Sequence, residues 1–379
     1  MNRKIVFVLA IFVCFRCSFH DEEVTETIPY FSDPVKKVLT VGSEDLPEKY
    51  LLDRPSPFHI GDNGDLYIFD EYYIKVFDKD GQPKTIFGGR GEGPGEFTGF
   101  SMGMWIAPTG ILAVVDNGWR YNLYAPDNSF IAKEDFRQTG TYKKLRDLLG
   151  LRTFFTENMV YFSREQRLIE GHQLLAYDDG DSVTTLVHYQ GKYLDKIHGT
   201  DQILNFNAFQ WQALPDYRAV YSHAGHDIIE DVNGTAFALH IVSLETMEER
   251  EIVVPYTRTV IPDSVIDKVI VIVMRRDEPN RKKLTDEEKD HVREIKYYSP
   301  FYRMIADGNI LFIFYGVEQF EGENSAIVVD LDTGKRISRV RFPMRPERIK
   351  NGYAYTIDTD QEGFYVIEKY RIDPAVYGK

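Results

Sequence analysis

The run of residues 88–97, with the sequence GGRGEGPGEF, constrains the fold more than any other stretch. Five of its ten residues are glycine and one is proline. Glycine loses much backbone entropy when it is ordered and proline lacks an N–H donor, so the run suits neither a helix nor a strand interior. It predicts a tight connection that ends on a buried plug, Phe97. Short strand patterns occur in the same order on both sides, which indicates that the run joins two units of a repeat.

The two units around this run have matching parts. In the first, a turn at 62–65 is followed by strands at 66–69 and 73–77, a hairpin turn at 78–81 and a strand at 85–87. In the second, the corresponding segments are 108–110, 111–115, 121–124, 125–128 and 129–132. Gly64 and Gly110 are 46 positions apart, as are Asp70 and Asp116. A period of about 40–50 residues with four short strands is typical of a β-propeller blade.

Four later copies show the same order more weakly. They cover strands at 173–177, 183–189 and 193–197, then 228–229, 236–243 and 251–254, then 310–314, 326–329 and 336–340, and finally 353–357 and 364–370. The count predicts an all-β fold, a six-bladed β-propeller of four-stranded blades. The lone strand at 35–41 is expected to complete the last blade and close the ring. A large β-sandwich with many hairpins is the alternative.

Two segments depart from the repeat and have helical character. Residues 142–149 predict a short helix. Residues 262–298 contain apolar residues at helical spacing between 265 and 273, and the capping box Thr285–Glu288 begins a second helix that would run to Lys296. This second segment predicts a helical insertion between blades four and five. It could be a lid on the binding face or a brace over a blade edge.

The N-terminus has the features of an export signal. Residues 2–4 are polar and basic, and Ile5–Phe15 is an apolar run of eleven residues, too short for a membrane span. The only cysteines are Cys14 and Cys17, so the body has neither a disulfide nor a cysteine-based zinc site. The leader resembles that of a bacterial lipoprotein with Cys17 as the acylated residue, although Phe15 and Arg16 replace the small residues expected there. Plain secretion and a retained anchor stay open.

The segment after the leader is expected to be a tether, over residues 18–34. Its acidic triplet 21–23 resembles signals that send some lipoproteins to the outer surface, or it is only a solvated stretch. We therefore expect an extracytoplasmic outer-membrane lipoprotein, periplasmic or surface-exposed, that meets the membrane only through its lipid. The formal net charge of -14 argues against nucleic acid as a partner, because there is no basic excess to release counterions.

The glycine run, with Pro108-Thr109-Gly110 and Val115-Asp116-Asn117, resembles the NHL-type repeat. In that repeat, spaced glycines and a phenylalanine precede a new blade, and an aspartate ends its second strand. The chain as a whole is similar to six-bladed propeller lipoproteins of Gram-negative bacteria. The resemblance is specific only over residues 62–124, because the later blades lack the glycine run.

One candidate binding site follows from the loops around the glycine run. Arg90, Glu92 and Glu96 lie on this connection, and the next blade has a turn at the equivalent place with Asn117, Trp119 and Arg120. Loops of this kind surround the channel mouth of a propeller, and an arginine beside a tryptophan suits contact with an anion or a sugar. The structural alternative is that Trp119 packs between blades and Arg90 pairs with Glu96.

The sequence supports a metal site less strongly than it supports this binding site. His223, His226 and Asp227 have the spacing of a loop site, but the same residues suit a polar turn that enters a strand. The acidic segments 178–181 and 330–332 could suit calcium, but neither continues to the glutamate of an EF-hand, and both suit hairpin turns. No nucleophile, zinc-protease or phosphate-loop motif occurs.

These observations favour a ligand-binding or scaffold module of the cell envelope, with a glycan, a peptide or an envelope protein as partner and no cofactor. The alternative, which the resemblance implies, is a metal-dependent lactonase or lyase with its site in the central channel. Acidic and histidine side chains from several blades that meet at the channel would favour the enzyme. A channel lined by arginine and aromatic side chains would favour binding.

Overall fold

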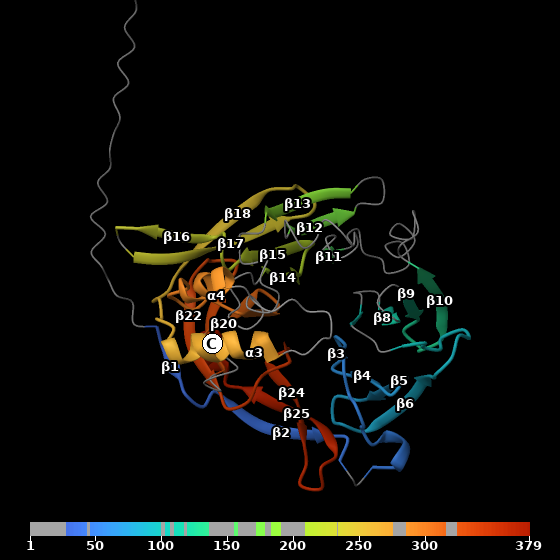
Figure 1. Ribbon diagram of the computed structural model, residues 1–379. Coiled ribbons are helices and arrows are strands. Elements are labelled where there is room, and N and C mark those ends of the chain that lie inside the picture. The colour runs from blue at the N-terminus through green and yellow to red at the C-terminus, as the bar shows by residue number, and fades with distance from the viewer. Residues whose placement is uncertain are drawn as a thin grey trace, which may run out of the picture.

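The protein is an all-β propeller whose sheets stand around a central axis (Figure 1). The computed structural model describes residues 28–43, 46–99, 103–106, 110–116, 120–135, 155–157, 172–178, 183–190, 209–232, 234–275, 286–315 and 324–379. In this part of the chain, five sheets have four or five strands and form five blades. We name each blade after its innermost strand.

The strands follow one another from the axis outward in nearly every blade. The β3 blade contains β3 (Phe58–Ile60), β4 (Leu66–Asp70), β5 (Tyr73–Phe77) and β6 (Pro83–Gly88), and the β7 blade contains β7 (Met104–Ile106), β8 (Leu112–Asp116), β9 (Arg120–Tyr124) and β10 (Phe130–Asp135). The β14 blade contains β14 (Phe209–Leu214), β15 (Arg218–His223), β17 (Gly234–Ser243) and β18 (Glu249–Pro255), with β16 (Ile228–Asp231) also paired to β17.

The last two blades both receive a strand from the N-terminal region. The β19 blade contains β19 (Arg303–Asp307), β20 (Ile310–Tyr315), β21 (Asn324–Asp330) and β22 (Arg336–Phe342), with β1 (Tyr30–Phe31) parallel to β22. The β23 blade contains β23 (Arg348–Lys350), β24 (Tyr353–Thr359) and β25 (Tyr365–Ile372), with β2 (Val35–Val41) antiparallel to β25. The expected closure of the ring by residues 35–41 is confirmed. Tyr30 and Phe31, expected in the tether, are part of the fold instead.

A further sheet has three described strands, β11 (Phe155–Glu157), β12 (His172–Asp178) and β13 (Val183–Gln190). It lies between the β7 and β14 blades in Figure 1. The strand expected at 193–197 and the helix expected at 142–149 lie outside the described residues.

The glycine run has the structure that its composition predicts. Gly88, Gly89 and Gly95 have positive φ angles of 92°, 145° and 75°, which glycine adopts without a steric penalty. Phe97 is fully buried, and its ring meets that of Phe69 edge-on with 5.0 Å between centroids. The plug fastens the β3 blade to the β7 blade, because Phe69 is on β4 and Phe97 directly precedes the β7 blade.

The repeated aspartates Asp70 and Asp116 have a shared structural role. Both are fully buried at the end of the second strand of their blade. Asp70 accepts hydrogen bonds from the backbone N–H groups of residues 53 and 54, and Asp116 accepts them from residues 98 and 99. Each carboxylate therefore holds the segment that leads into its own blade, which explains the 46-residue spacing.

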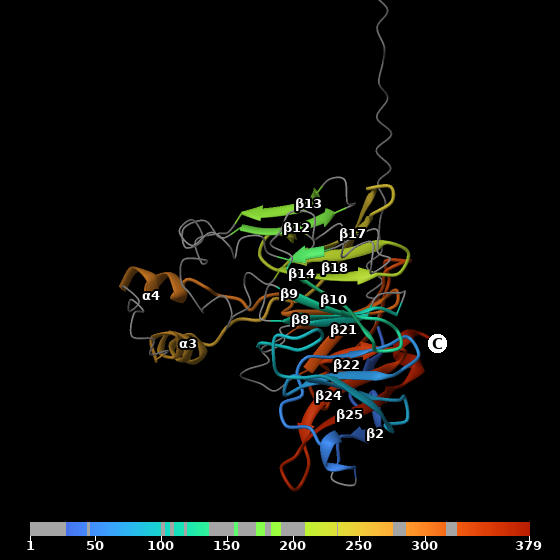
Figure 2. The same cartoon turned by 90° about the vertical axis from the view of Figure 1, so that its right-hand side faces the viewer.

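Two helices lie between β18 and β19 along the chain, α3 (Asp263–Arg275) and α4 (Asp286–Arg293). They stand away from the sheets on one side of the ring (Figure 2). The chain leaves and returns side by side, because Ile261 donates its N–H to Lys296 and Tyr298 donates its N–H to Thr259. The second helix ends at Arg293 and is shorter than expected. No helix of the described segments has the length and hydropathy that a bilayer span requires.

Candidate functional site

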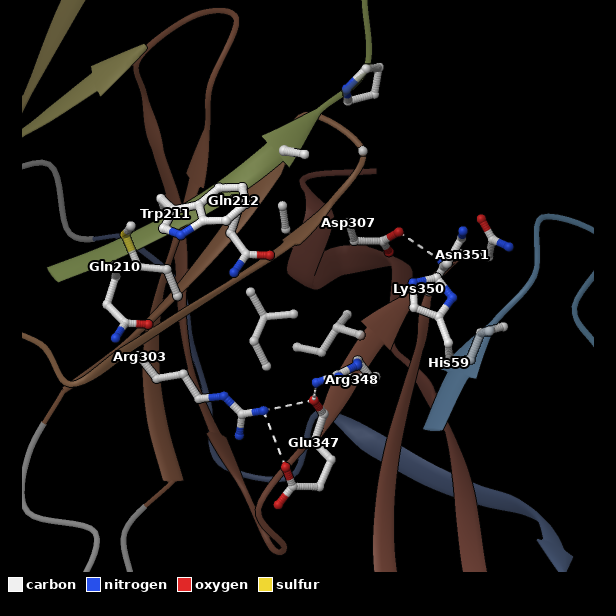
Figure 3. A pocket seen from close by; sticks show the side chains of 18 of the residues that line it. His59, Gln210, Trp211, Gln212, Arg303, Asp307, Glu347, Arg348, Lys350 and Asn351 are labelled. Carbon is white, nitrogen blue, oxygen red and sulfur yellow. Dashed lines mark hydrogen bonds and ion pairs between the residues drawn. The ribbon is translucent and has the colours of Figure 1, made fainter. Parts of the chain in front are cut away.

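A pocket of about 840 Å³ lies on the axis of the propeller and is lined by the innermost strands of all five blades (Figure 3). Its walls come from β3, β7, β14, β19 and β23. The sheets radiate from the axis, so side chains on these strands converge although they are far apart in sequence. The volume falls within the range of small-ligand sites, about 300–1,000 Å³.

Three cations and three carboxylates line this pocket. The cations are Arg303, Arg348 and Lys350, and the acids are Asp62, Asp307 and Glu347. Arg303 donates to the carboxylate of Glu347 at 3.3 Å and to the carbonyl oxygens of residues 346 and 347 at 2.8 and 2.7 Å. Lys350 pairs with Asp62 at 2.6 Å. Two of the three cations therefore have a carboxylate partner within the fold.

Asp307 has a different environment. Its carboxylate accepts hydrogen bonds from the backbone N–H groups of Asn351 and Gly352 at 2.7 and 2.8 Å, and from the hydroxyl of Tyr377 at 2.8 Å. Burial, followed by the charge of Asp307, raises the pKa of Tyr377 far above its usual range, so this hydroxyl stays protonated and donates. Asp307 thus ties β19 to the turn after β23, and its acceptor capacity is largely used within the protein.

Arg348 is the cation that the fold leaves least compensated. Its guanidinium donates one hydrogen bond, at 2.9 Å, to the carbonyl oxygen of Glu347, and lies 5.8 Å from the ring centroid of Phe58. Among the residues that the structure describes, it forms no ion pair. Burial, and then the charge of Arg303, lower the pKa of Arg348 below its usual value, with only partial relief from Glu347. A guanidinium has five N–H donors, so most of its donor capacity is unused here.

His59 completes this corner of the pocket. Burial, and then the charges of Lys350 and Arg348, lower the pKa of His59 to about 3. The ring is therefore neutral at physiological pH and adds no charge. Its Nδ1 atom is buried and has no hydrogen-bond partner within the described part of the chain. Buried polar atoms without partners are few in native proteins, and a bound water or ligand is one way in which such an atom is satisfied.

The opposite wall consists of β14, which presents Gln210, Trp211 and Gln212 (Figure 3). Trp211 packs in part against the cluster of Phe209 and Tyr221 and in part lines the pocket. The two glutamine amides offer both donors and acceptors toward a ligand. The pocket therefore combines a cationic corner with a wall that suits uncharged polar groups.

The residues proposed from the glycine run do not line this pocket. Glu96 folds back on its own loop, where its carboxylate accepts the N–H of Gly93 at 2.8 Å. Arg90 is exposed and its guanidinium carbon lies 5.3 Å from the ring centroid of Tyr72. Glu92 is also exposed. The pair between Arg90 and Glu96, which was the structural alternative to a binding role, is not among the described contacts, and the loop stabilises a junction between blades.

The turn at the equivalent place in the next blade, with Asn117, Trp119 and Arg120, gives a similar result, because its described residue Arg120 does not line the axial pocket. Arg120 donates to the hydroxyl of Thr98 at 2.5 Å and lies 3.5 Å from the carboxylate of Asp116. It therefore belongs to the buried aspartate network and not to the axial pocket. Asn117, Trp119 and Cys17 lie outside the described residues.

The histidine turn is a polar turn that enters a strand. His223 accepts the backbone N–H groups of residues 225 and 226 with Nδ1, at 3.0 and 3.2 Å. Asp227 accepts the N–H of His223 at 2.7 Å and the hydroxyl of Tyr189 at 2.8 Å. The described residues contain no group of three or more histidine, cysteine or acidic side chains placed to share a metal ion.

Asp227 also belongs to a titratable network in the β14 blade. Its carboxylate is 3.6 Å from His240 Nε2, and the other ring nitrogen of His240 is 2.7 Å from Glu249. Burial opposes ionisation of Asp227, but hydrogen bonds from His240, His223 and Tyr189 outweigh it and lower the pKa of the carboxyl group. The same contact with Asp227 raises the pKa of His240 against the effect of burial.

Of the two acidic segments that could suit calcium, 330–332 forms a hairpin turn. Asp330 is the acceptor of this turn, because its carboxylate accepts the N–H groups of residues 332 and 333.

The pocket residues were not predicted from the sequence, although a signal for them exists. β19 ends immediately before Gly308, and β23 ends immediately before Asn351-Gly352, and residue pairs such as Asp-Gly and Asn-Gly predict turns. The residues just before each such turn form the innermost strand. Reading backward from the turns would have placed Arg303, Arg348 and Lys350 on the axis.

No protein-family model matches the sequence, and no curated protein matches it. Solved structures share the general architecture. A candidate exported protein from Bacteroides fragilis is 11% identical with a TM-score of 0.44, over 91% of this chain and 99% of that chain. A protein of unknown function from Bacteroides caccae is 10% identical with a TM-score of 0.33, over 77% and 84%. The Pan2 WD40 domain of Neurospora crassa is 9% identical with a TM-score of 0.39, over 91% and 98%. Likenesses this remote carry no functional argument.

Proposed function

We propose that this protein is a binding module of the cell envelope that holds its ligand in the axial pocket. The observation that carries the proposal is the convergence of five innermost strands on one pocket with a mixed polar lining. The arginine, glutamine and tryptophan side chains found there are the types that hold and orient ligands. The paired carboxylates Glu347 and Asp62 already bind Arg303 and Lys350. These contacts favour binding over acid–base chemistry.

The architecture that we propose has six blades. The sheet of β11, β12 and β13 supplies the remaining blade, between the β7 and β14 blades, and the segment with α3 and α4 is a helical insertion between two blades. Support comes from the chain order, because each blade occupies a continuous stretch of sequence except for the strands supplied by residues 28–41. None of the lining residues of the axial pocket comes from α3 or α4.

We also propose that the protein is exported and anchored by a lipid on Cys17, at the outer membrane. The basic and apolar leader supports this proposal. The anchor would reach the propeller where β1 runs along β22, at the outer edge of the β19 blade. Mass spectrometry of the protein from its native membrane should find an N-terminus at Cys17 that carries diacylglycerol and fatty acid. A Cys17→Ser protein that stays equally membrane-bound would contradict the anchor.

Blocking the pocket tests the binding function directly. Ala213 lines the pocket and has an exposed side chain, so Ala213→Phe should fill it without disturbing the core. Ala375 is exposed at the far rim, and Ala375→Phe is the matched control. We expect the full-length protein to retain glycans or peptides from an envelope extract, Ala375→Phe to retain the same molecules, and Ala213→Phe to lose them. Identical retention by both variants would overturn the axial pocket as the binding site.

A further inference from the structure

We propose that the axial pocket recognises a singly charged carboxylate on a carbohydrate, with the carboxylate bound at Arg348. This inference rests on the proposed binding function and adds the class of ligand.

The charge balance of the pocket selects a ligand with little charge. Three cations, Arg303, Arg348 and Lys350, face three acids, Asp62, Asp307 and Glu347. Two of the cations are paired inside the fold at 3.3 and 2.6 Å. Arg348 and Asp307 remain, and because Asp307 is already bound by two backbone N–H groups and the Tyr377 hydroxyl, Arg348 is the charged group left for a ligand. A monoanion matches it, whereas a dianionic phosphate would meet the acidic side chains with excess negative charge.

The geometry of Arg348 favours a carboxylate. Guanidinium groups bind carboxylates through two parallel N–H donors, and Arg348 uses one hydrogen bond within the fold, with the carbonyl oxygen of Glu347 at 2.9 Å. Burial strengthens such a bond because water competes less for the donors. The ring of His59 in the same corner is neutral and therefore adds no further positive charge to the site.

The opposite wall suits the rest of a sugar. Gln210 and Gln212 project from β14 toward the same pocket as Arg348, as Figure 3 shows. Amide side chains can both donate to and accept from ring hydroxyl groups. Trp211 adds a partly exposed apolar surface on the same strand. A wall of amides beside one uncompensated guanidinium thus fits a polyhydroxylated acid better than a fully apolar acid.

The test is isothermal titration of the full-length protein with acidic oligosaccharides and their neutral methyl esters. The probes are sialyllactose, an oligosaccharide with a single galacturonate unit and an oligosaccharide with a single glucuronate unit, each with one carboxylate and each paired with its ester. We expect at least one acid to bind and its ester to bind at least about tenfold more weakly. Arg348→Gln should weaken binding of the acid about tenfold or more and leave binding of the ester unchanged. Arg371→Gln, at an exposed arginine outside the pocket, is the control and should change neither.

Two further variants keep the test decisive. Arg348→Lys retains the charge but not the two-pronged donor and should recover only part of the affinity. Gln212→Ala should weaken acid and ester alike. Melting temperatures within a few degrees of the parent protein show that the variants fold.

Other outcomes overturn the inference in distinct ways. Equal binding of acid and ester contradicts the carboxylate, and preferential binding of inorganic phosphate or of triglutamate contradicts the ligand class. If none of the acids binds, the inference fails while the binding function stands or falls by the separate experiment with Ala213→Phe.

Discussion

At the scale of single residues, a buried aspartate stabilises each of the two most similar blades from within. Asp70 pairs with Lys75 on the next strand at 2.7 Å, whereas Asp116 lies 3.6 Å from Lys133, one strand further out. Lys133 is directly opposite Asn122, the residue that corresponds to Lys75 in register. In the β7 blade, Arg120 on the next strand and Lys133 one strand further out thus take the place of Lys75, while the carboxylate has stayed in place. The position of the charge in space is retained, not its position in the sequence.

Removal of the Asp116 carboxylate should be strongly destabilising. Asp116→Ala leaves the N–H groups of residues 98 and 99 without their acceptor and removes the negative charge beside Arg120 and Lys133. We expect a loss of about 3 kcal/mol in the free energy of unfolding, as for the breaking of other buried charge pairs. Urea denaturation measures it. Asp80→Ala is the control, because Asp80 is an exposed hairpin residue whose removal should leave the midpoint nearly unchanged. Equal midpoints for both variants would contradict the structural role of Asp116.

His240 should make stability depend on pH in a narrow window. The hydrogen bond with Asp227 raises its pKa above the unfolded value of about 6.5, so its contribution is fully present below that pH and is lost as pH rises through the folded pKa. Asp227 itself titrates far below this window, and Tyr189 and Tyr221 titrate above it. The difference in melting temperature between the parent and His240→Gln should therefore shrink from pH 6 to pH 9. A constant difference would show that His240 does not change its charge between pH 6 and pH 9.

At the scale of elements, the innermost strands were the hardest to predict. β3, β7 and β23 have three residues each, too few to show an alternation of polar and apolar positions. The middle and outer strands are longer and bury apolar side chains between blades, as in β8 and β21, so their pattern predicted them well. The sequence was therefore sufficient for the ring and its closure but not for the wall of the pocket. The turn after each innermost strand marks which residues reach the axis, but which side chains of different blades meet there depends on the relative placement of the blades, and no local pattern encodes that placement.

The fold should tolerate a new covalent connection to the closing strand β2 but should not tolerate removal of this strand. β2 pairs with β25, Asp373 donates its N–H to Pro34, and the C-terminal 3-10 helix at Pro374–Tyr377 packs on β22 beside β1. A permuted chain that runs from residue 46 to 379 and continues through a short glycine-serine linker into residues 28–43 should fold with a near-parental melting temperature. The same chain without residues 28–43 should aggregate, because β25 becomes an exposed edge. Size-exclusion chromatography and circular dichroism distinguish the two outcomes, and a soluble, cooperatively folded deletion would refute the closure.

At the scale of the whole molecule, measurement of bound metal distinguishes a binding module from a metal-dependent lactonase or lyase. The pocket acids Glu347, Asp62 and Asp307 are engaged with Arg303, Lys350 and the turn after β23. We therefore expect elemental analysis of the dialysed full-length protein to find less than one divalent ion per chain, and EDTA to leave the melting temperature unchanged. One tightly held ion per chain would favour the enzyme, and lactone and ester substrates should then be assayed.

The pairing of β2 with β25 also has a consequence for synthesis. It joins residues as far apart as Lys37 and Glu368, 331 positions along the chain. The ribosome delivers β2 first, and this strand has no partner until residues 365–372 have been made. A polypeptide interrupted anywhere before that point keeps an open ring with an unpaired edge, exposed to proteases. Folding thus distinguishes full-length from truncated chains, because only a chain translated through β25 can pair β2 and become resistant to proteases.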